Sequence, residues 1–515
     1  MCVSHRSTAA ACKQVLPALL AGSITSLAFP PDGLWYLAPL TGVALVHASL
    51  HGTSPLAALC SGAAFGVGLY GFTLSWLFAG IRPGDASVLA YVAPAVVIVA
   101  FSAAPALVAF VAALARRAGA SAFTVAGLLL PALWTVAEWT RHFSVFRFPW
   151  AHLGYSQVPD GPLMALAPLT GVLGLSFLTV LIGAMFAAMV GNPDRSVRHA
   201  GSAFLAATGV GIVAVSSLNW TQPAGGTIRV ALHQGAFPMS AKFETETVLR
   251  ALKTYGAAAG DSSATITILP ETALPLLEHH LPKGYLDTLH ALAQIEGRDV
   301  LLSFFREAGG QPGYFSSAQV IGASGRQMRD KRVLVPFGEY VPAAAWLRPI
   351  YERIATVPLL DTLPGALEQG GLILGGVRVG LKLCFEDAFG DLFRDEVANA
   401  RLLIVMANDS WDGSSAPMHQ HLQIAQTRAA EAGKPLIRVA NTGWSALIAA
   451  DGHLVATAPP DVPAALEVFV QPHEGVTPYI RYGDAIPLGI AALAALIALF
   501  ATLHRPDTAV QAVRK

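Results

Sequence analysis

Charge is scarce in this chain of 515 residues, and most of it lies in one half. Asp, Glu, Lys and Arg make up 13% of the residues, against about 25% in a soluble globular protein. The first 220 residues carry five acidic and nine basic side chains, and all the other charged residues follow them. This division predicts a membrane-embedded half, residues 1–220, followed by a water-exposed domain.

An excess of charge of one sign is also missing, as are the usual metal motifs. The chain has 33 acidic and 33 basic residues, so no basic surplus points to nucleic acid as a partner. Of the four cysteines, Cys384 alone lies in the polar half, which excludes a disulfide framework there. There is no HExxH pattern and no CxxC pair, and no Cys or acid completes a ligand set with His419 and His421. We therefore expect neither a metal nor a cofactor.

Long apolar runs are abundant. A membrane-spanning helix needs about 20 mainly apolar residues. Eight segments are candidates: 14–30, 34–50, 55–79, 86–114, 121–140, 162–190, 201–218 and 485–503. The run 86–114 is long enough to tilt, or to break at Pro94 or Pro105. We expect a polytopic helical bundle of about eight spans, with the final span and a tail in residues 477–515.

The basic residues predict the orientation of this bundle, because Lys and Arg favour the cytoplasmic side. Eight spans put both termini on the same side. If that side is the cytoplasm, nine basic residues lie inside and three lie in short outer loops: Arg6, Lys13, Arg116, Arg117, Arg195, Arg198, Arg505, Arg514 and Lys515 against Arg82, Arg141 and Arg147. We therefore expect an inner-membrane protein of a bacterium, with cytoplasmic termini and residues 221–476 in the periplasm.

In residues 221–476, short apolar runs alternate with amphipathic stretches, which predicts an α/β sandwich. The expected strands are 227–235, 264–272, 299–305, 317–323, 377–384, 400–409 and 435–443, and the expected helices are 241–259, 284–296 and 417–432. Three of these strands end in polar residues, at Glu271, Cys384 and Asp409. Functional groups of α/β folds gather at the carboxyl ends of strands.

These residue types suit acyl transfer. A thiol is mostly protonated at neutral pH, and no histidine adjoins Cys384 to remove its proton. A buried carboxylate such as Glu271 can do so, and a fixed ammonium such as Lys331 can stabilise the oxyanion. Each residue also has an ordinary interpretation: Cys384 as a buried strand cysteine, Glu271 as a helix cap and Lys331 as a solvated charge.

Three motifs, "LPETA" (269–273), "DKRVLVPFGEYVP" (330–342) and "LCFED" (383–387), resemble the Glu, Lys and Cys motifs of the nitrilase, or carbon–nitrogen hydrolase, superfamily. Together with the eight spans, "GAAFGVGLYGFTLSWLF" (62–78) and "FPWAHLGYSQ" (148–157) resemble the bacterial apolipoprotein N-acyltransferase family. The resemblance implies a four-layer αββα domain above a membrane bundle.

It also implies a reaction. Cys384 would take an acyl chain from a phospholipid, typically phosphatidylethanolamine, as a thioester. The acyl chain would then pass to the α-amino group of the N-terminal diacylglyceryl-cysteine of an apolipoprotein. Glu271 would be the general base and Lys331 the oxyanion stabiliser. Glu339 would support Lys331, and Glu386 would shape the turn that carries the nucleophile.

The resemblance also implies which residues would contact the substrate: Trp411, Phe243 and Phe385. Trp411 would sit on a loop near the substrate. Phe243 stands where the family pattern has Trp, Phe385 where Tyr is frequent, and Arg147 where Gly is common. The aromatic loop 138–157 is either an interfacial belt or the wall of a lipid-entry site, where Arg141 or Arg147 could meet a phosphate.

Two other functions are compatible with parts of the sequence. A membrane-tethered amidase of the nitrilase type would share the Glu, Lys and Cys motifs but release acyl groups to water. A transporter with an outer binding domain would need ionisable residues along a membrane path, and Glu138 is the main candidate in the apolar half.

Overall fold

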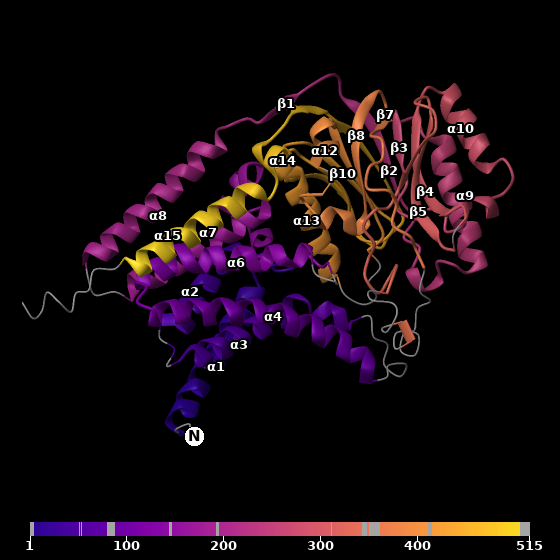
Figure 1. Cartoon of the computed structure of the whole chain (residues 1–515). Helices are drawn as coiled ribbons and strands as arrows, with labels where there is room; N and C mark the ends of the chain where they lie inside the picture. The colour runs from indigo at the N-terminus through magenta and orange to yellow at the C-terminus, as the bar shows by residue number, and fades with distance from the viewer. Residues whose placement is uncertain are drawn as a thin grey trace, which may run out of the picture.

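The computed structural model describes residues 5–50, 52, 54–79, 88–143, 147–191, 195–310, 312–341, 348–349, 361–392, 394–409 and 415–504. A helical bundle packs against an α/β domain (Figure 1). The bundle contains α1 (His5–Ser26), α2 (Leu40–Leu50), α3 (Pro55–Thr73), α4 (Val88–Arg117), α5 (Ala122–Thr124), a π-helical turn (Val125–Leu129), α6 (Leu130–Trp139), α7 (Ala167–Val190), α8 (Arg195–Ser216) and α15 (Ala485–Leu503).

Each of the eight predicted apolar segments forms helix. Within the described residues, five helical segments are long and apolar enough to cross a membrane: Pro55–Thr73, Tyr91–Arg117, Ala122–His142, Pro162–Val190 and Ala485–Leu503. Three shorter apolar helices cover the other predicted spans: Gln14–Ser26, Trp35–Leu50 and Gly201–Ser216. Helix α4 runs through Pro94 and Pro105 without ending, so the break considered for this segment does not occur.

One membrane helix starts directly against the α/β domain. Near the start of α7, Gly171 has φ 61° and ψ −176°, and a Cβ there would lie 2.2 Å from the Tyr479 ring. A side chain is therefore excluded at this position by both backbone conformation and contact. The next amide, of Val172, donates a hydrogen bond to Glu431 Oε1 at 2.9 Å.

The α/β domain is built on two six-stranded sheets. The first has the order β12 (Leu454–Ala458), β11 (Ser445–Ile448), β10 (Leu436–Ala440), β9 (Leu402–Ala407), β8 (Val377–Leu383) and β7 (Leu372–Leu374). The second has the order β13 (Ala464–Val470), β2 (Ile228–Gln234), β3 (Ile266–Ile268), β4 (Asp299–Glu307), β5 (Tyr314–Gly322) and β6 (Gln327–Asp330). A small sheet pairs β1 (Thr221–Pro223) with β14 (His473–Gly475). The strands β8, β9 and β10 are parallel, as are β2, β3 and β4.

The layers follow the expected αββα order. An apolar core that includes Ile266, Leu381 and Ile404 lies between the two sheets. Helices α9 (Thr245–Asp261) and α10 (Tyr285–Ile295) cover the outer face of the second sheet (Figure 1). Helices α12 (Arg394–Asn399), α13 (Ala416–Ala432) and α14 (Pro478–Tyr482) lie between the first sheet and the bundle (Figure 1).

The predicted strand 264–272 is shorter in the structure, because β3 ends at Ile268. Pro270 has no amide to donate to a ladder, and Thr272 has φ 52°, outside the extended region. The chain therefore turns just before and after Glu271. The proposed domain limits at residues 220/221 and 476/477 stay a prediction.

The bundle and the α/β domain share one hydrophobic core, in which Trp76 and Trp150 lie with Phe385. The indole Nε1 atoms of Trp76 and Trp150 both donate to Gln420 Oε1 on α13, at 3.1 and 2.7 Å. Helix α13, which covers the first sheet, is thus attached to the bundle by packing and by buried hydrogen bonds.

Candidate active site

Five polar residues follow strands at the same region of the two sheets. Cys384 follows β8, Asp409 lies just after β9, and Asn441 follows β10. Glu271 lies three residues after β3, and Lys331 directly follows β6. Because β8, β9 and β10 are parallel, their carboxyl ends meet at one edge of the sheet.

A buried ammonium joins two buried carboxylates. Lys331 Nζ donates to Glu271 Oε1 at 2.9 Å and to Glu339 Oε1 at 2.8 Å. The other oxygen of Glu339 accepts the Val335 amide at 2.7 Å, which fixes the carboxylate in its loop. Burial opposes the charge of Lys331, but the carboxylates of Glu271 and Glu339 outweigh it and raise the pKa of Lys331 well above its usual range. Lys331 is therefore a fixed cation.

Cys384 sits in a strained backbone conformation. Its φ of 50° is unusual for a residue with a side chain, and such strain is typical of functional positions. The residue is 8% exposed. Burial raises the pKa of the Cys384 thiol well above its usual range, and the Glu271 carboxylate adds to this, while Lys331 works in the opposite direction. The thiol is therefore neutral at rest, and a nucleophilic attack requires a base.

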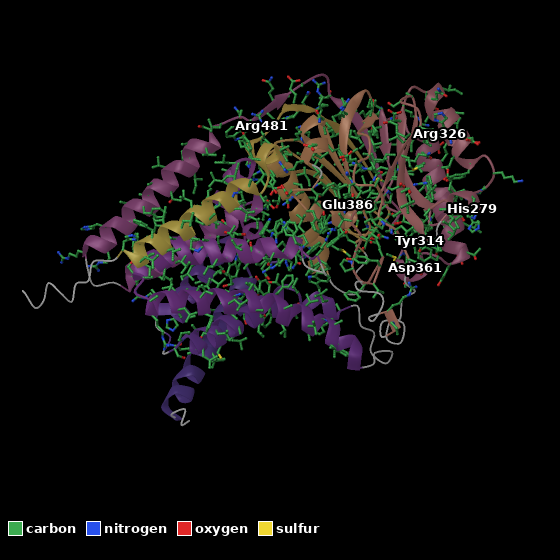
Figure 2. The ribbon with its side chains drawn as sticks, in the orientation of Figure 1. His279, Tyr314, Arg326, Asp361, Glu386 and Arg481 are labelled. Carbon is green, nitrogen blue, oxygen red and sulfur yellow. The ribbon has the colours of Figure 1, made fainter. Side chains whose placement is uncertain are left out.

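Glu386 connects the cysteine turn to the lysine loop. Its Oε2 accepts the Leu383 amide at 2.8 Å, and its Oε1 accepts the amides of Arg332 and Val333 at 2.6 and 3.2 Å. The side chain is 1% exposed and lies in the interior of the molecule, in contrast to Arg326 at the periphery (Figure 2). One carboxylate thus holds the residues before Cys384 and after Lys331 together.

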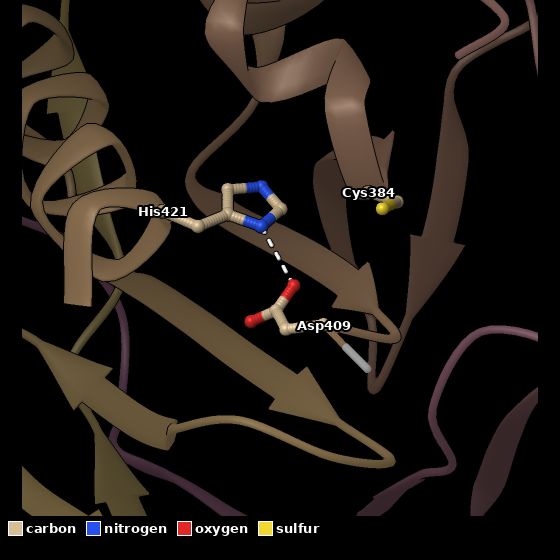
Figure 3. A group of neighbouring side chains, drawn as sticks. All are labelled: Cys384, Asp409 and His421. Atoms are coloured by element: carbon tan, nitrogen blue, oxygen red, sulfur yellow. Dashed lines mark hydrogen bonds and ion pairs between the residues drawn. The ribbon is translucent and has the colours of Figure 1, made fainter. Parts of the chain in front are cut away.

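Near the thiol lies a second group of charged side chains, of which Figure 3 shows Asp409 and His421. Ligand atoms of Cys384, Asp409 and His421 all lie within 4.8 Å of one another. His421 Nδ1 donates to Asp409 Oδ1 at 2.7 Å, and Nε2 donates to Asp387 Oδ1 at 2.8 Å. Arg438 pairs with Asp409 and lies 3.6 Å from Asp387 Oδ2.

This arrangement corrects the sequence analysis, which found no acid to accompany His421. The acids come from distant strand ends. Despite burial and the nearby Arg438 charge, Asp387 and Asp409 raise the pKa of His421 to about 9. Both ring nitrogens donate to carboxylates, so neither has a lone pair for a metal ion. The carboxylates of Asp387 and Asp409 and the cations of His421 and Arg438 together form a neutral group. This group supports the turn beside Cys384.

The predicted substrate-contact residues differ in their surroundings. Phe385 is 4% exposed and stacks on Phe148 and Trp150 of the membrane half, with ring centroids 6.0 and 6.4 Å apart. Phe243 is 51% exposed and lies 6.3 Å from the Phe305 ring. Trp411 lies outside the described residues.

The aromatic loop 138–157 contributes to both the bundle and the site. Arg141 is buried, donates to Tyr70 Oη and to the carbonyls of Trp150 and Ala151, and stacks on the Phe101 ring at 4.3 Å. These contacts give Arg141 a structural role, because both terminal nitrogens of its guanidinium already donate to the protein. Arg147 is exposed, with φ 25° where the family pattern has glycine.

Sequence reasoning missed Lys242 and Asp387. Lys242 follows the short helix η7 (Met239–Ala241) and is 5% exposed. Burial lowers the pKa of Lys242 to about 8, and the Glu271 carboxylate opposes this. In the sequence it is one basic residue among polar neighbours, and no local signal marks it. Asp387 is within the "LCFED" motif, so its position three residues after Cys384 could have identified it as a candidate site residue.

Comparison with known proteins gives matches over most of the chain. The family model described as apolipoprotein N-acyltransferase N-terminal domain matches residues 21–185, and that of carbon-nitrogen hydrolase matches residues 229–468. The apolipoprotein N-acyltransferase of Nitrosomonas europaea is 32% identical over 498 residues, which cover 95% of this chain and 98% of the relative. This chain belongs to the apolipoprotein N-acyltransferase family.

Further relatives agree with this family. The apolipoprotein N-acyltransferases of Chromobacterium violaceum and Methylococcus capsulatus are 34% and 35% identical, and the matches cover 94% of each relative and 95% and 93% of this chain. Among solved structures, a mutant of the Nesterenkonia AN1 amidase from the nitrilase superfamily is 17% identical, with TM-score 0.36, covering 51% of this chain and 97% of that chain. The family membership and the apolar helices support an acyltransferase of a bacterial membrane.

Proposed function

We propose that this chain moves an acyl chain from a glycerophospholipid, with phosphatidylethanolamine as donor, to the N-terminal α-amino group of diacylglyceryl-cysteine in apolipoproteins. The observation that carries the proposal is the buried Glu271–Lys331–Glu339 network beside the Cys384 thiol. Membership of the apolipoprotein N-acyltransferase family supports the acyl transfer and a lipoprotein as acceptor.

In the first half of the reaction, Glu271 takes the proton of Cys384 as Sγ attacks the ester carbonyl carbon of the phospholipid. The tetrahedral intermediate carries its negative charge on the former carbonyl oxygen, and the Lys331 ammonium stabilises that charge. When the intermediate collapses, the C–O bond to glycerol breaks and Glu271 returns the proton to the leaving oxygen. The products are a lysophospholipid and a thioester on Cys384.

In the second half, the neutral α-amino group of the acceptor attacks the thioester carbonyl carbon. Glu271 accepts a proton from the amine, the C–S bond breaks, and the proton returns to the Cys384 sulfur. An amide forms and the enzyme is restored. This sequence of two half-reactions predicts ping-pong kinetics.

The aromatic residues beside the nucleophile favour an acyl chain as the transferred group. Phe148 and Trp150 stack on each other with an interplanar angle of 3°, and both stack on Phe385, which follows Cys384. Burying methylene groups against such a wall is favourable by about 0.8 kcal/mol each. The wall comes from the membrane half, from which a lipid substrate would arrive.

The proposal is tested by intact mass spectrometry of the full-length protein in detergent. After incubation with phosphatidylethanolamine, the wild type should gain the mass of one acyl group on Cys384, whereas Cys384→Ala should gain none. Addition of a diacylated lipopeptide should remove the adduct and yield a triacylated lipopeptide.

The same experiment identifies the alternatives. Release of free fatty acid at the same rate with and without the lipopeptide would indicate an amidase-like hydrolase instead. An acyl adduct of equal yield in Glu271→Gln would exclude Glu271 as the base, and an adduct on a residue other than Cys384 would reject the proposed nucleophile.

A further inference from the structure

The proposed reacting groups come from both sheets of the α/β domain. Cys384 follows β8 of the first sheet, whereas Glu271 and Lys331 follow β3 and β6 of the second. The core between the two sheets consists of apolar side chains, and apolar packing is not directional. Hydrogen bonds that join the sheets beside the site therefore determine how far the thiol lies from the ammonium.

One edge of β8 is completed by carboxylates where the neighbouring strand ends. Within the described residues, β7 pairs with β8 only as far as Val379. Two residues further on, the Leu381 amide donates to Glu396 Oε1 at 2.9 Å. The next amide that points to the same edge donates to Glu386 Oε2 at 2.8 Å. Glu396, on α12, thus takes the place of a strand three residues before Cys384.

The other oxygen of Glu396 binds the segment that carries the proposed oxyanion cation. Glu396 Oε2 accepts from the guanidinium of Arg329, on β6, and from Arg332 Nη2 at 2.9 Å. Arg329 is 1% exposed and Arg332 8% exposed, and Lys331 lies between them in the sequence. A single carboxylate therefore joins β8 of the first sheet to β6 of the second.

The shared carboxylate also holds two like charges together. Burial and the Arg329 charge lower the pKa of Arg332 to about 10, and the Glu386 carboxylate opposes this. Without the charge of Glu396, two buried guanidiniums would repel each other where water screens them little. Loss of this charge should therefore move the segment of Lys331 away from β8.

We propose that Glu396 is a positioning residue of the reaction, which holds the segment of Lys331 against β8 and so sets the distance between the Lys331 ammonium and the Cys384 thiol. Glu396 acts through Leu381 and the two arginines and transfers no proton itself. The inference rests on the proposed function, because it takes Cys384 as nucleophile and Lys331 as oxyanion stabiliser.

The test measures the rate of acyl-adduct formation on Cys384 over a range of phosphatidylethanolamine concentrations, with the full-length protein in detergent and intact mass spectrometry. Glu396→Gln keeps the shape of the side chain but removes its charge. A double variant adds Arg329→Gln, which removes one of the two like charges. Asp395→Asn, at an exposed position of the same helix, is the matched control. The thermal midpoint of each variant is recorded in parallel.

Glu396→Gln should lower the maximum rate of adduct formation about ten-fold, because Lys331 no longer lies where the oxyanion forms. The phospholipid concentration at half the maximum rate should change by less than about two-fold, because no contact with the lipid is lost. The double variant should be at least about three-fold faster than Glu396→Gln, because the repulsion between the arginines is relieved. Asp395→Asn should match the wild type.

An unchanged maximum rate in Glu396→Gln would overturn the inference, and so would a change in the half-saturating concentration alone. A double variant that is no faster than Glu396→Gln would also overturn it, because independent losses indicate a packing role. If Glu396→Gln does not fold, Glu396→Asp decides. Its carboxylate is one methylene too short to span from the Leu381 amide to the arginines, and a wild-type rate in this variant rejects the inference.

Failure of the wild type to form an acyl adduct would instead reject the proposed function. The inference is then decided by alkylation of Cys384 with iodoacetamide at pH 7, which needs a base but no lipid. Glu271, which Lys331 contacts at 2.9 Å, moves with the lysine segment. Glu396→Gln should therefore be alkylated more slowly than the wild type, and equal alkylation rates would overturn the inference.

Discussion

At the scale of single residues, the best-supported positioning group is Glu386. Its carboxylate accepts three backbone amides, from Leu383, Arg332 and Val333, on two segments that carry the proposed nucleophile and the proposed oxyanion cation. Hydrogen bonds to a charged acceptor contribute about 1.5–3 kcal/mol each. Loss of the carboxylate should therefore displace Cys384 relative to Lys331.

We expect Glu386→Gln to form the acyl adduct on Cys384 at least about a hundred-fold more slowly, because about 3 kcal/mol of positioning is lost and each factor of ten needs 1.4 kcal/mol. The amide group of glutamine would also point a donor at a backbone amide. The measurement is the rate of adduct formation by mass spectrometry, with the thermal midpoint recorded in parallel. Glu368→Gln, at an exposed glutamate, is the control. An unchanged rate in Glu386→Gln would show that other contacts hold the turn.

At the scale of elements, α13 connects the two halves of the molecule through polar side chains. Gln420 accepts two indole donors from the bundle, whereas His421, the next residue, bridges Asp387 and Asp409 in the catalytic domain. Both side chains are at most 5% exposed. A helix that is polar in sequence is thus largely buried, and the side chains of Gln420 and His421 keep hydrogen-bond partners there.

The stability that His421 contributes should depend on pH. Its pKa is raised from 6.5 to about 9 in the folded protein, where Asp387 and Asp409 hold it, so the contribution is complete below about pH 6.5 and is lost as the pH rises through about 9. The shift corresponds to up to about 3 kcal/mol. The pKa of Asp409 is lowered by Arg438 and His421 despite burial, so the contribution of this carboxylate is lost only in acid, below its unfolded pKa of 3.8.

The measurement is the thermal midpoint of the wild type minus that of His421→Gln between pH 6 and pH 10. Buried lysines titrate in both proteins and cancel in the difference. The wild type should lose its advantage over the variant across this range. A difference that is constant with pH would mean that His421 is neutral in the folded protein.

The elements themselves were largely predictable, and their long-range partners were not. Apolar runs and strand–helix alternation predicted the eight apolar helical segments, five of them long enough to cross a membrane, and the seven strands considered, because these patterns are local. The resemblance of the motifs around Glu271 and Lys331 anticipated the contact between these two side chains, while the catalytic roles of Glu271, Lys331 and Cys384 stay predictions. The burial of Lys242 and the pairing of His421 with Asp387 and Asp409 could not be predicted, because both depend on packing between residues far apart in the sequence.

At the scale of the whole molecule, the bundle and the catalytic domain form one body with a shared core. Cys384 therefore faces the same side of the membrane as any exposed residue of the catalytic domain. The distribution of Lys and Arg predicts that the catalytic domain faces the periplasm. Four of the basic residues counted, Arg82, Arg505, Arg514 and Lys515, lie outside the described residues.

This orientation can be tested with two exposed positions on opposite sides of the bundle. Lys283 lies in the catalytic domain, and Arg117 is the last residue of α4, on the side predicted to be cytoplasmic. In a variant without other cysteines, Lys283→Cys should react with a membrane-impermeant maleimide in intact spheroplasts. Arg117→Cys should react only after the membrane is permeabilised, because the bilayer excludes the charged reagent. The opposite pattern would put the nucleophile on the cytoplasmic side, where a periplasmic lipoprotein substrate could not reach it.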